Sequence, residues 1–390
     1  MKRLLVVITI GFLLSACSKE AGVKRKLNVV EGKKFHRLEF RKVFEITLHY
    51  CKWCFPVYKG VLCLQSLDSQ NRKFRLTLFD YDGKVIKKRD FLTGQGPNEL
   101  LASIFRCAWV RSDLREVIAI DVGEFVKSIN AESLTIRTIA KPGLKNFYFC
   151  KAAALNNVEE KGDRAIMAMG SAGFYENNTY YIVEWDRMFK NYRVIRKLKK
   201  MNPQRLKTKK KRVIYTDYYW KLREALPLTV DWKREVVYLV PDTAEKPLIE
   251  RMDVKTGKSE RYRIEIDFKK FKIDRKRIEY FCQWFNEELP ELLKKSLKYL
   301  CYFPSYPPPV QGIKVIKDWL LVITGKRKWN EGRNWTLVYR LPELSYEGSF
   351  YIPFPDYGLE IKWIDGNYYI TRKVLEGENV KYSIYRVKEK

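Results

Sequence analysis

The chain has 390 residues, of which 46% are hydrophobic and 31% are charged, and its formal net charge at pH 7 is +30. Its only two histidines, His36 and His49, are poor material for a catalytic triad or for a metal site built from several histidines. The positive charge favours polyanions or anionic membrane surfaces as partners and indicates nothing about the fold.

The first residues have the features of an export signal. Lys2 and Arg3 precede an apolar run at 4–14, which has the length of a secretory h-region and is too short to span a bilayer. The sequence Leu-Ser-Ala-Cys at 14–17 resembles the lipobox of bacterial lipoproteins. In that family the cysteine becomes the acylated first residue of the mature chain.

This resemblance divides the chain into three parts. We expect a lipoprotein signal peptide at 1–16, a lipidated tether at 17–34 that begins with an acylated Cys17, and a single folded domain at 35–390. The alternative is an ordinary signal peptide that is cut near Ala16. Either signal predicts export from the cytoplasm. The lipobox in addition predicts a lipid anchor in a membrane.

Seven cysteines follow Cys17, so they cannot all pair within the chain. Cys51 and Cys54 form a C-x-x-C, but no thioredoxin-like strand and helix surround it, and no histidine follows Cys54 as in a haem attachment site. We expect either a local disulfide or two partly buried thiols here. A zinc site that adds His49 is the alternative.

One hairpin pattern recurs six times along the chain. In the first copy, two strands of alternating polarity flank Asp82-Gly83, a strong hairpin signal. The copies lie at 74–91, 126–139, 180–198, 248–266, 336–352 and 381–390. A further pair of strand-like runs precedes each copy, which gives six units of four strands. Because one small sheet cannot bury its own faces, the units predict propeller blades, with a β-sandwich or two β-domains as the alternative.

The two ends of the folded domain are predicted to pair. The last unit stops before its outer strand, whereas residues 35–50 supply a spare strand ahead of the first unit. Over 274–300, apolar residues recur at intervals of three and four, as in helices. We therefore predict an all-β, six-bladed β-propeller with a short helical insertion at 274–300 and an N-terminal closing strand. Some of the four cysteines near the starts of units should line its channel without pairing: Cys54, Cys107, Cys150 and Cys301.

A glycine-rich loop lies between the first and second units. It resembles the G-x-G-P-G-E loop of NHL-type repeats, which occurs together with a lipobox in six-bladed propeller lipoproteins of Bacteroidetes and similar bacteria. The resemblance covers the anchor and the first two units and implies membership of that lipoprotein family. We interpret the loop as structural, and it comprises Gly94, Gln95, Gly96, Pro97, Asn98 and Glu99. Asn98 replaces a glycine of the pattern and tolerates positive φ.

The stretch 196–212, between the third and fourth units, contains ten basic residues. Such a run is usually a solvated loop. The functional interpretation is a binding strip for an anionic glycan, a phospholipid or an envelope protein, with nucleic acid less favoured because the protein is exported. The candidate anion-binding residues are Arg205, Lys207, Lys209, Lys210, Lys211 and Arg212.

No catalytic constellation is present among the usual motifs of hydrolases and phosphate-binding enzymes. The paired carboxylates Glu159/Glu160 and Glu287/Glu288 are expected at the surface. We expect a lipid-anchored protein of the cell envelope that acts as a non-catalytic binding or scaffold protein, with no metal and no cofactor. The alternatives are a propeller-type hydrolase or lyase, and a structural component of an envelope or surface polysaccharide assembly.

Overall fold

The computed structural model describes residues 23–68, 72–94, 96, 98–100, 105–121, 125–142, 147–148, 158–171, 179–199, 226–241, 247–267, 310–328, 331–353, 363–364, 369–376 and 379–390. Within these ranges the secondary structure is almost entirely β, with no α-helix. The same ranges contain no helix that is long and apolar enough to cross a membrane. The predicted helical insertion at 274–300 and the predicted signal peptide at 1–16 lie outside them.

Within the described ranges the strands form six small sheets, which we number in chain order. The first sheet contains β3 (Cys51–Val57), β4 (Gly60–Ser66), β5 (Lys73–Phe79) and β6 (Val85–Leu92). The second contains β7 (Phe105–Val110), β8 (Glu116–Asp121), β9 (Val126–Asn130) and β10 (Ile136–Ala140). The third contains β11 (Phe147–Tyr148), β12 (Val158–Lys161), β13 (Arg164–Ser171), β14 (Thr179–Asp186) and β15 (Tyr192–Lys199).

The other three sheets follow the same plan, and two of them also take a strand from the N-terminal region. The fourth contains β16 (Leu228–Asp231), β17 (Val236–Leu239), β18 (Leu248–Asp253), β19 (Ser259–Glu265) and β1 (Val23–Asn28). The fifth contains β20 (Val310–Ile316), β21 (Trp319–Lys328), β22 (Arg333–Arg340) and β23 (Ser345–Pro353). The sixth contains β24 (Trp363–Ile364), β25 (Tyr369–Glu376), β26 (Asn379–Glu389) and β2 (Leu38–His49).

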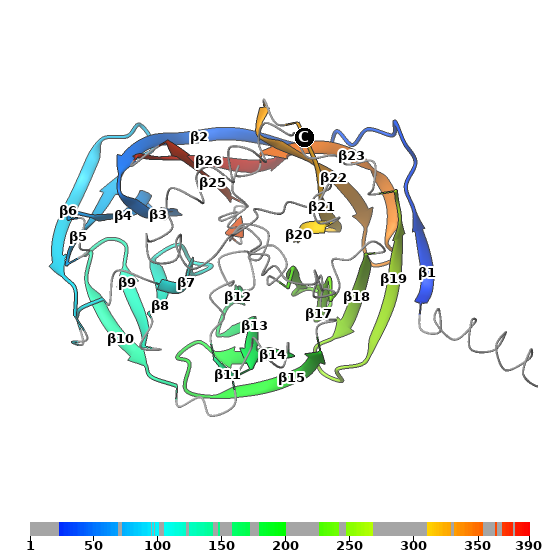
Figure 1. Cartoon of the computed structure of the whole chain (residues 1–390), viewed down its shortest axis with the longest axis horizontal. Helices are drawn as coiled ribbons and strands as arrows, with labels where there is room; N and C mark the ends of the chain where they lie inside the picture. Colours follow the sequence, from blue (N-terminus) through cyan, green and yellow to red (C-terminus); the bar gives the residue numbers. More distant parts are fainter. Residues whose placement is uncertain are drawn as a thin grey trace, which may run out of the picture.

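The sheets follow one another around a common centre (Figure 1). The first strands of each unit lie toward the centre, whereas β6, β10, β15, β19 and β23 run along the rim. Small antiparallel sheets in radial repetition are the arrangement of propeller proteins. The fold is therefore all-β and propeller-like, as the repeated hairpins predict.

The hydrophobic core is divided among the junctions between neighbouring sheets. One cluster joins the sixth, first and second sheets, and others fill the junctions from the second sheet to the sixth. Strands in the middle of a sheet are consequently buried on both faces: β4 is buried at six of its seven residues. The rim strand β6 is exposed at seven of eight. This difference explains why β4 reads as a continuous apolar run.

The antiparallel strands place two kinds of connection at opposite ends of the ring. The turns between β3 and β4 (58–59) and between β9 and β10 (131–135), and the corresponding turns of other units, gather at one end, which we call the tight-turn end. The chain leaves a rim strand for the next unit at the other end. The two largest such connections are 200–227 and 266–309, and most of their residues lie outside the described ranges.

The predicted pairing of the N-terminal strand with the C-terminal unit is present. β2 runs antiparallel to β26 from Leu38, opposite Glu389, to His49, opposite Asn379. Side chains add to the backbone ladder, because Ser383 Oγ donates to Glu45 Oε2 at 2.8 Å. The sheet order makes β2 the rim strand of the sixth sheet.

A second N-terminal strand was not expected. Residues 23–28, which the sequence analysis assigns to the tether, form β1 and pair in parallel with the rim strand β19. Two interactions hold β1 there: the side chain of Leu27 is buried, and Lys24 forms an ion pair with Glu260. The tether prediction is wrong for this segment, because an uncovered rim strand offers unpaired backbone groups to any nearby extended chain.

Several tight turns contain a non-glycine residue with a left-handed backbone. Leu114, Leu134, Phe189 and Leu344 have φ between 55° and 60°, and all four side chains are buried. Each side chain belongs to a hydrophobic cluster between neighbouring sheets. The turns therefore contribute to packing between the sheets.

Candidate functional site

Two consecutive carboxylates on β12, Glu159 and Glu160, form the centre of a buried polar network. Successive side chains of a strand point to opposite faces of its sheet. Glu160 therefore faces the second sheet, whereas Glu159 faces the fourth and fifth. Both carboxylates are buried.

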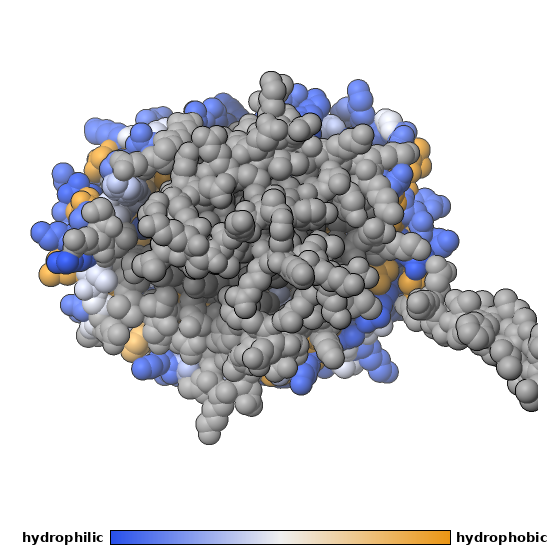
Figure 2. Space-filling view, viewed as in Figure 1, coloured by the Kyte–Doolittle hydropathy of each residue, from blue (hydrophilic) through white to orange (hydrophobic). Residues whose placement is uncertain are grey.

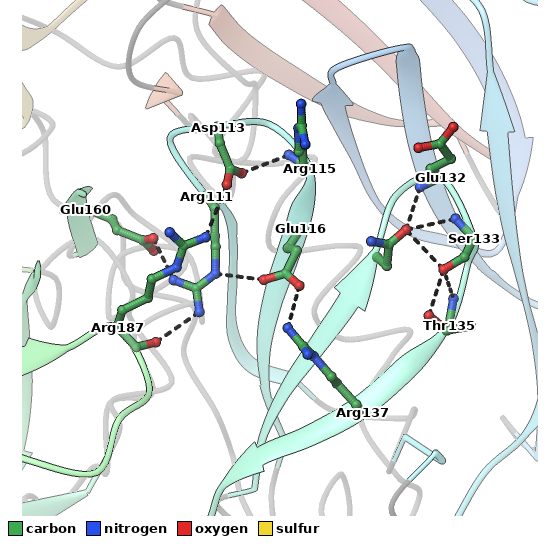
Figure 3. A network of polar contacts seen from close by, with 11 residues as sticks. Arg111, Asp113, Arg115, Glu116, Glu132, Ser133, Thr135, Arg137, Glu160 and Arg187 are labelled. Atoms are coloured by element: carbon green, nitrogen blue, oxygen red, sulfur yellow. Dashed lines mark hydrogen bonds and ion pairs between the residues drawn. The ribbon is translucent and has the colours of Figure 1, made fainter. Parts of the chain in front are cut away.

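Glu160 binds the inner strand of the second sheet. Its Oε1 accepts a hydrogen bond from Arg111 Nη1 at 2.7 Å, and its Oε2 accepts one from Trp109 Nε1, also at 2.7 Å. The Arg111 guanidinium also donates to Glu116 Oε2 at 3.1 Å and to the carbonyl oxygen of Arg187 at 2.9 Å (Figure 3). Nε, Nη1 and Nη2 of Arg111 thus all donate hydrogen bonds within the protein.

The surroundings of Glu160 shift the pKa of its carboxyl. Burial raises the pKa of its carboxyl, and the positive charge of Arg111 together with the Trp109 hydrogen bond opposes this rise without cancelling it. The protein can bury this carboxyl group because Arg111 and Trp109 pair with it. An unpaired charge would be far more costly to bury.

Glu159 connects three sheets. Lys314 Nζ, on β20 of the fifth sheet, donates to both carboxylate oxygens at 2.7 and 2.8 Å. Thr229 Oγ1, on β16 of the fourth sheet, donates to Oε1 at 2.9 Å and accepts a hydrogen bond from the Val315 amide at 3.0 Å. The side chains of Lys314 and Glu159 are only 3% and 5% exposed.

The expectation that Glu159 and Glu160 lie at the surface is wrong. Each is buried because a cation from another sheet neutralises it, and the sequence contains no local sign of these partners, which lie 49 and 155 residues away. Their position in the sequence could have indicated burial. Both residues precede the apolar run at 165–170, which places them on an inner strand of the third unit. Glu287 and Glu288 lie outside the described ranges.

The contacts of the glycine-rich loop link the first and second sheets. Gly96 donates its N–H to Glu99 Oε2 at 2.8 Å, and its carbonyl accepts from Lys127 Nζ at 2.9 Å. A Cβ atom on Gly94 would lie 1.9 Å from Glu99 Oε2, so any other residue there would require the Glu99 side chain to move. Lys127 also donates to Thr138 Oγ1 at 2.7 Å. Gln95 and Pro97 lie outside the described residues.

The cysteines behave differently from the expectation of unpaired thiols. Cys54 on β3 forms a disulfide with Cys63, directly opposite on β4, because the two are cross-strand neighbours whose Cα atoms lie 4.1 Å apart. Cys51 Sγ lies 3.6 Å from Cys54 Sγ. The His49 ring contacts the Tyr50 ring at a tilt, with ring centroids 4.0 Å apart, and does not belong to this sulfur cluster. Cys150, Cys301 and the side chain of Cys107 lie outside the described part of the chain.

The six candidate anion-binding residues at 205–212 also lie outside the described ranges, and only the first four residues of the basic stretch are seen, as the end of β15. The described site is therefore the buried network around Glu159 and Glu160. Chemically, it joins the inner strands of four sheets through charge-assisted hydrogen bonds.

The chain matches no known family model, and no curated protein matches it by sequence. Among solved structures it is similar to an exported protein of Bacteroides fragilis NCTC 9343, with 12% identity and a TM-score of 0.42 over 94% of this chain and 99% of that one. An oligogalacturonate lyase in complex with manganese has 9% identity and a TM-score of 0.41 over 90% and 97%. TolB of Acinetobacter baumannii has 10% identity and a TM-score of 0.40 over 81% and 59%. These are propeller-like proteins, and the values are too low to transfer a function.

Proposed function

We propose that the chain is a closed six-bladed β-propeller. Six sheets around a common centre support this, as does the pairing of β2 with β26. The sixth sheet contains the N-terminal strand β2 and the C-terminal strand β26, and so holds the first and last units together. Because closure leaves each sheet with a neighbour on both faces, it also accounts for the division of the core among the junctions.

The proposed role is that of a lipid-anchored binding or scaffold protein at the cell envelope, without catalytic activity of its own. The observation that carries it is the engagement of Glu159 and Glu160, the buried inner-strand carboxylates, by Lys314 and Arg111. Both acids serve the framework that joins the sheets. A rigid ring with a net charge of +30 is suited to presenting basic loops to an anionic partner.

The basic residues at 205–212 are proposed to make the main contact with that partner, an acidic glycan or a phospholipid surface. Changing all six candidate residues to serine should weaken retention of the detergent-solubilised protein on immobilised alginate, an acidic polysaccharide. The parent should elute progressively earlier as salt increases, because exposed charges are screened beyond about 8–10 Å at physiological ionic strength. Neutral dextran is the control matrix. Equal retention of parent and variant at low salt would show that this stretch is a solvated loop.

The anchor is proposed to be a lipid on Cys17. Mass spectrometry of protein extracted from its native membrane should show an N-terminal diacyl or triacyl adduct at this residue, and Cys17→Ser should release the protein from the membrane fraction. Recovery of an unmodified soluble chain that begins at or after Cys17 would contradict the proposal.

A further inference from the structure

A pocket of about 360 Å³ lies between the first and second sheets at the tight-turn end. Three buried apolar side chains, Val57, Leu78 and Ala131, contribute to its lining. The polar part of the lining comes from three turns and includes Tyr58, Lys59, Arg115 and Glu132. Figure 3 shows Arg115 and Glu132 at the same end of the second sheet. The volume lies within the usual range for small-ligand sites.

The aromatic ring of Tyr58 lies exposed beside this pocket. The residue is 65% exposed, although its backbone is fixed by an amide hydrogen bond to the Leu114 carbonyl of the neighbouring sheet at 2.9 Å. The guanidinium carbon of Arg115 lies over the ring, 5.7 Å from its centroid. An exposed aromatic ring on an anchored backbone at a concave site offers a surface on which the C–H face of a sugar ring can pack.

The charge around the pocket is predominantly positive. Glu132 forms an ion pair with Lys59, and its carbonyl oxygen accepts a hydrogen bond from Lys87 Nζ at 3.4 Å. The Lys59 hydrogen bond, followed by the charges of Arg115 and Lys87, lowers the pKa of the Glu132 carboxyl. Three cations therefore surround one carboxylate. Because the ion pair is solvent-exposed, a competing anion can replace it at little cost.

We infer that this pocket binds a uronic acid unit of an acidic oligosaccharide. Tyr58 packs against the sugar ring, and Arg115 and Lys59 bind the sugar carboxylate in place of Glu132. The guanidinium is suited to this task because its planar donors match a carboxylate in two-point geometry. The inference rests on the proposed binding role and specifies its ligand class, at a place distant in sequence from the 205–212 stretch.

Calorimetric titration of the detergent-solubilised full chain tests the inference. The probes are a trisaccharide of glucuronic acid, the neutral trisaccharide of the same linkage, and inorganic phosphate. We expect binding of the acidic trisaccharide only. Tyr58→Ala and Arg115→Gln should each weaken it about tenfold, which corresponds to about 1.4 kcal/mol. Lys255→Gln, at an exposed position in a tight turn of the fourth sheet, is the matched control and should bind as the parent does.

Glu132→Gln provides a test in the opposite direction. Removing the internal carboxylate should strengthen binding of the acidic trisaccharide several-fold, a gain that misfolding cannot produce. The inference is overturned if the neutral trisaccharide binds equally well, if phosphate alone binds as tightly, or if the Tyr58 and Arg115 variants bind like the parent. A variant with serine at the six positions of 205–212 should keep trisaccharide binding, so failure of the pocket and failure of the basic stretch are distinguishable.

Discussion

At the scale of single residues, Leu134 combines an unfavourable backbone with complete burial. Its φ of 59° crowds the Cβ atom against the backbone, which costs roughly 1–2 kcal/mol for a non-glycine residue. Its fully buried side chain packs in the cluster that joins the first and second sheets. Packing a leucine of this kind is worth about 2–5 kcal/mol, so burial outweighs the strain.

Leu134→Gly should therefore destabilise the protein, although glycine is the residue that suits the turn. We expect a net loss of about 0–4 kcal/mol, the packing lost minus the strain relieved, measured by urea denaturation. Lys317→Gly is the matched control, since Lys317 has φ of 53° and a half-exposed side chain. It should raise the free energy of unfolding slightly, because the same backbone strain of roughly 1–2 kcal/mol is relieved and only an exposed ion pair is lost. If Leu134→Gly were stabilising, the buried side chain would contribute less than its backbone costs.

At the scale of elements, side chains as well as backbone hydrogen bonds hold β2 against β26. Glu45 on β2 contacts Ser383 and Lys381 on β26 and Lys42 on its own strand. Burial alone would raise the pKa of Glu45, but these three donors lower it to about 2. The carboxylate form therefore stabilises the pairing of the two strands.

This predicts how β2 responds to acid. Because the pKa of Glu45 is lower in the folded than in the unfolded chain, its contribution is complete above about pH 4.5 and is lost as the pH falls toward 2. Glu45→Gln should lower the free energy of unfolding at pH 7 and match the parent near pH 2, as measured by urea denaturation at both values. Glu39→Gln, at an exposed position on the same strand, is the control. An equal difference between Glu45→Gln and the parent at both pH values would disprove the role of its charge.

The sequence predicts elements better than it predicts contacts between them. Asp82-Gly83 indicates a hairpin because the turn chemistry is local, and the repetition of hairpins indicates radial packing. Leu134 gives no such signal, since leucine has no preference for positive φ and only the neighbouring sheet favours it there. The partners of Glu159 and Glu160 are equally hidden, because sequence patterns do not reveal which distant cation faces a given acid.

At the scale of the whole molecule, ion pairs connect most neighbouring sheets in the described part of the chain. Beside the inner-strand network, Arg164 pairs with Glu235 between the third and fourth sheets, and Arg234 pairs with Asp318 between the fourth and fifth. Lys317 pairs with Glu389 between the fifth and sixth. Most of these pairs are partly exposed and individually weak, whereas Lys314–Glu159 is buried.

The two buried pairs, Arg111–Glu160 and Lys314–Glu159, should therefore dominate the coupling, and the second of them gives a direct test. Lys314→Met leaves the Glu159 carboxylate buried and should destabilise the protein by about 3–5 kcal/mol, and Glu159→Gln should have a similar effect by leaving the ammonium. The double variant should lose much less than the sum of the two single losses, which a double-mutant cycle on urea unfolding measures. Additive losses would mean that the two groups do not depend on one another.

The pairing of β1 with β19 would orient the ring if Cys17 carries the proposed lipid. Since the two strands are parallel and β19 leaves a tight turn, β1 also begins at the tight-turn end. Five residues lie between Cys17 and Val23, so the two can be at most about 20 Å apart. With Cys17 acylated as proposed, the tight-turn end and its pocket face the bilayer at close range. In that orientation the opposite end, from which the two largest connections leave, is directed away from the anchoring bilayer, so the proposal for 205–212 then favours an acidic glycan over the phospholipid surface of that bilayer.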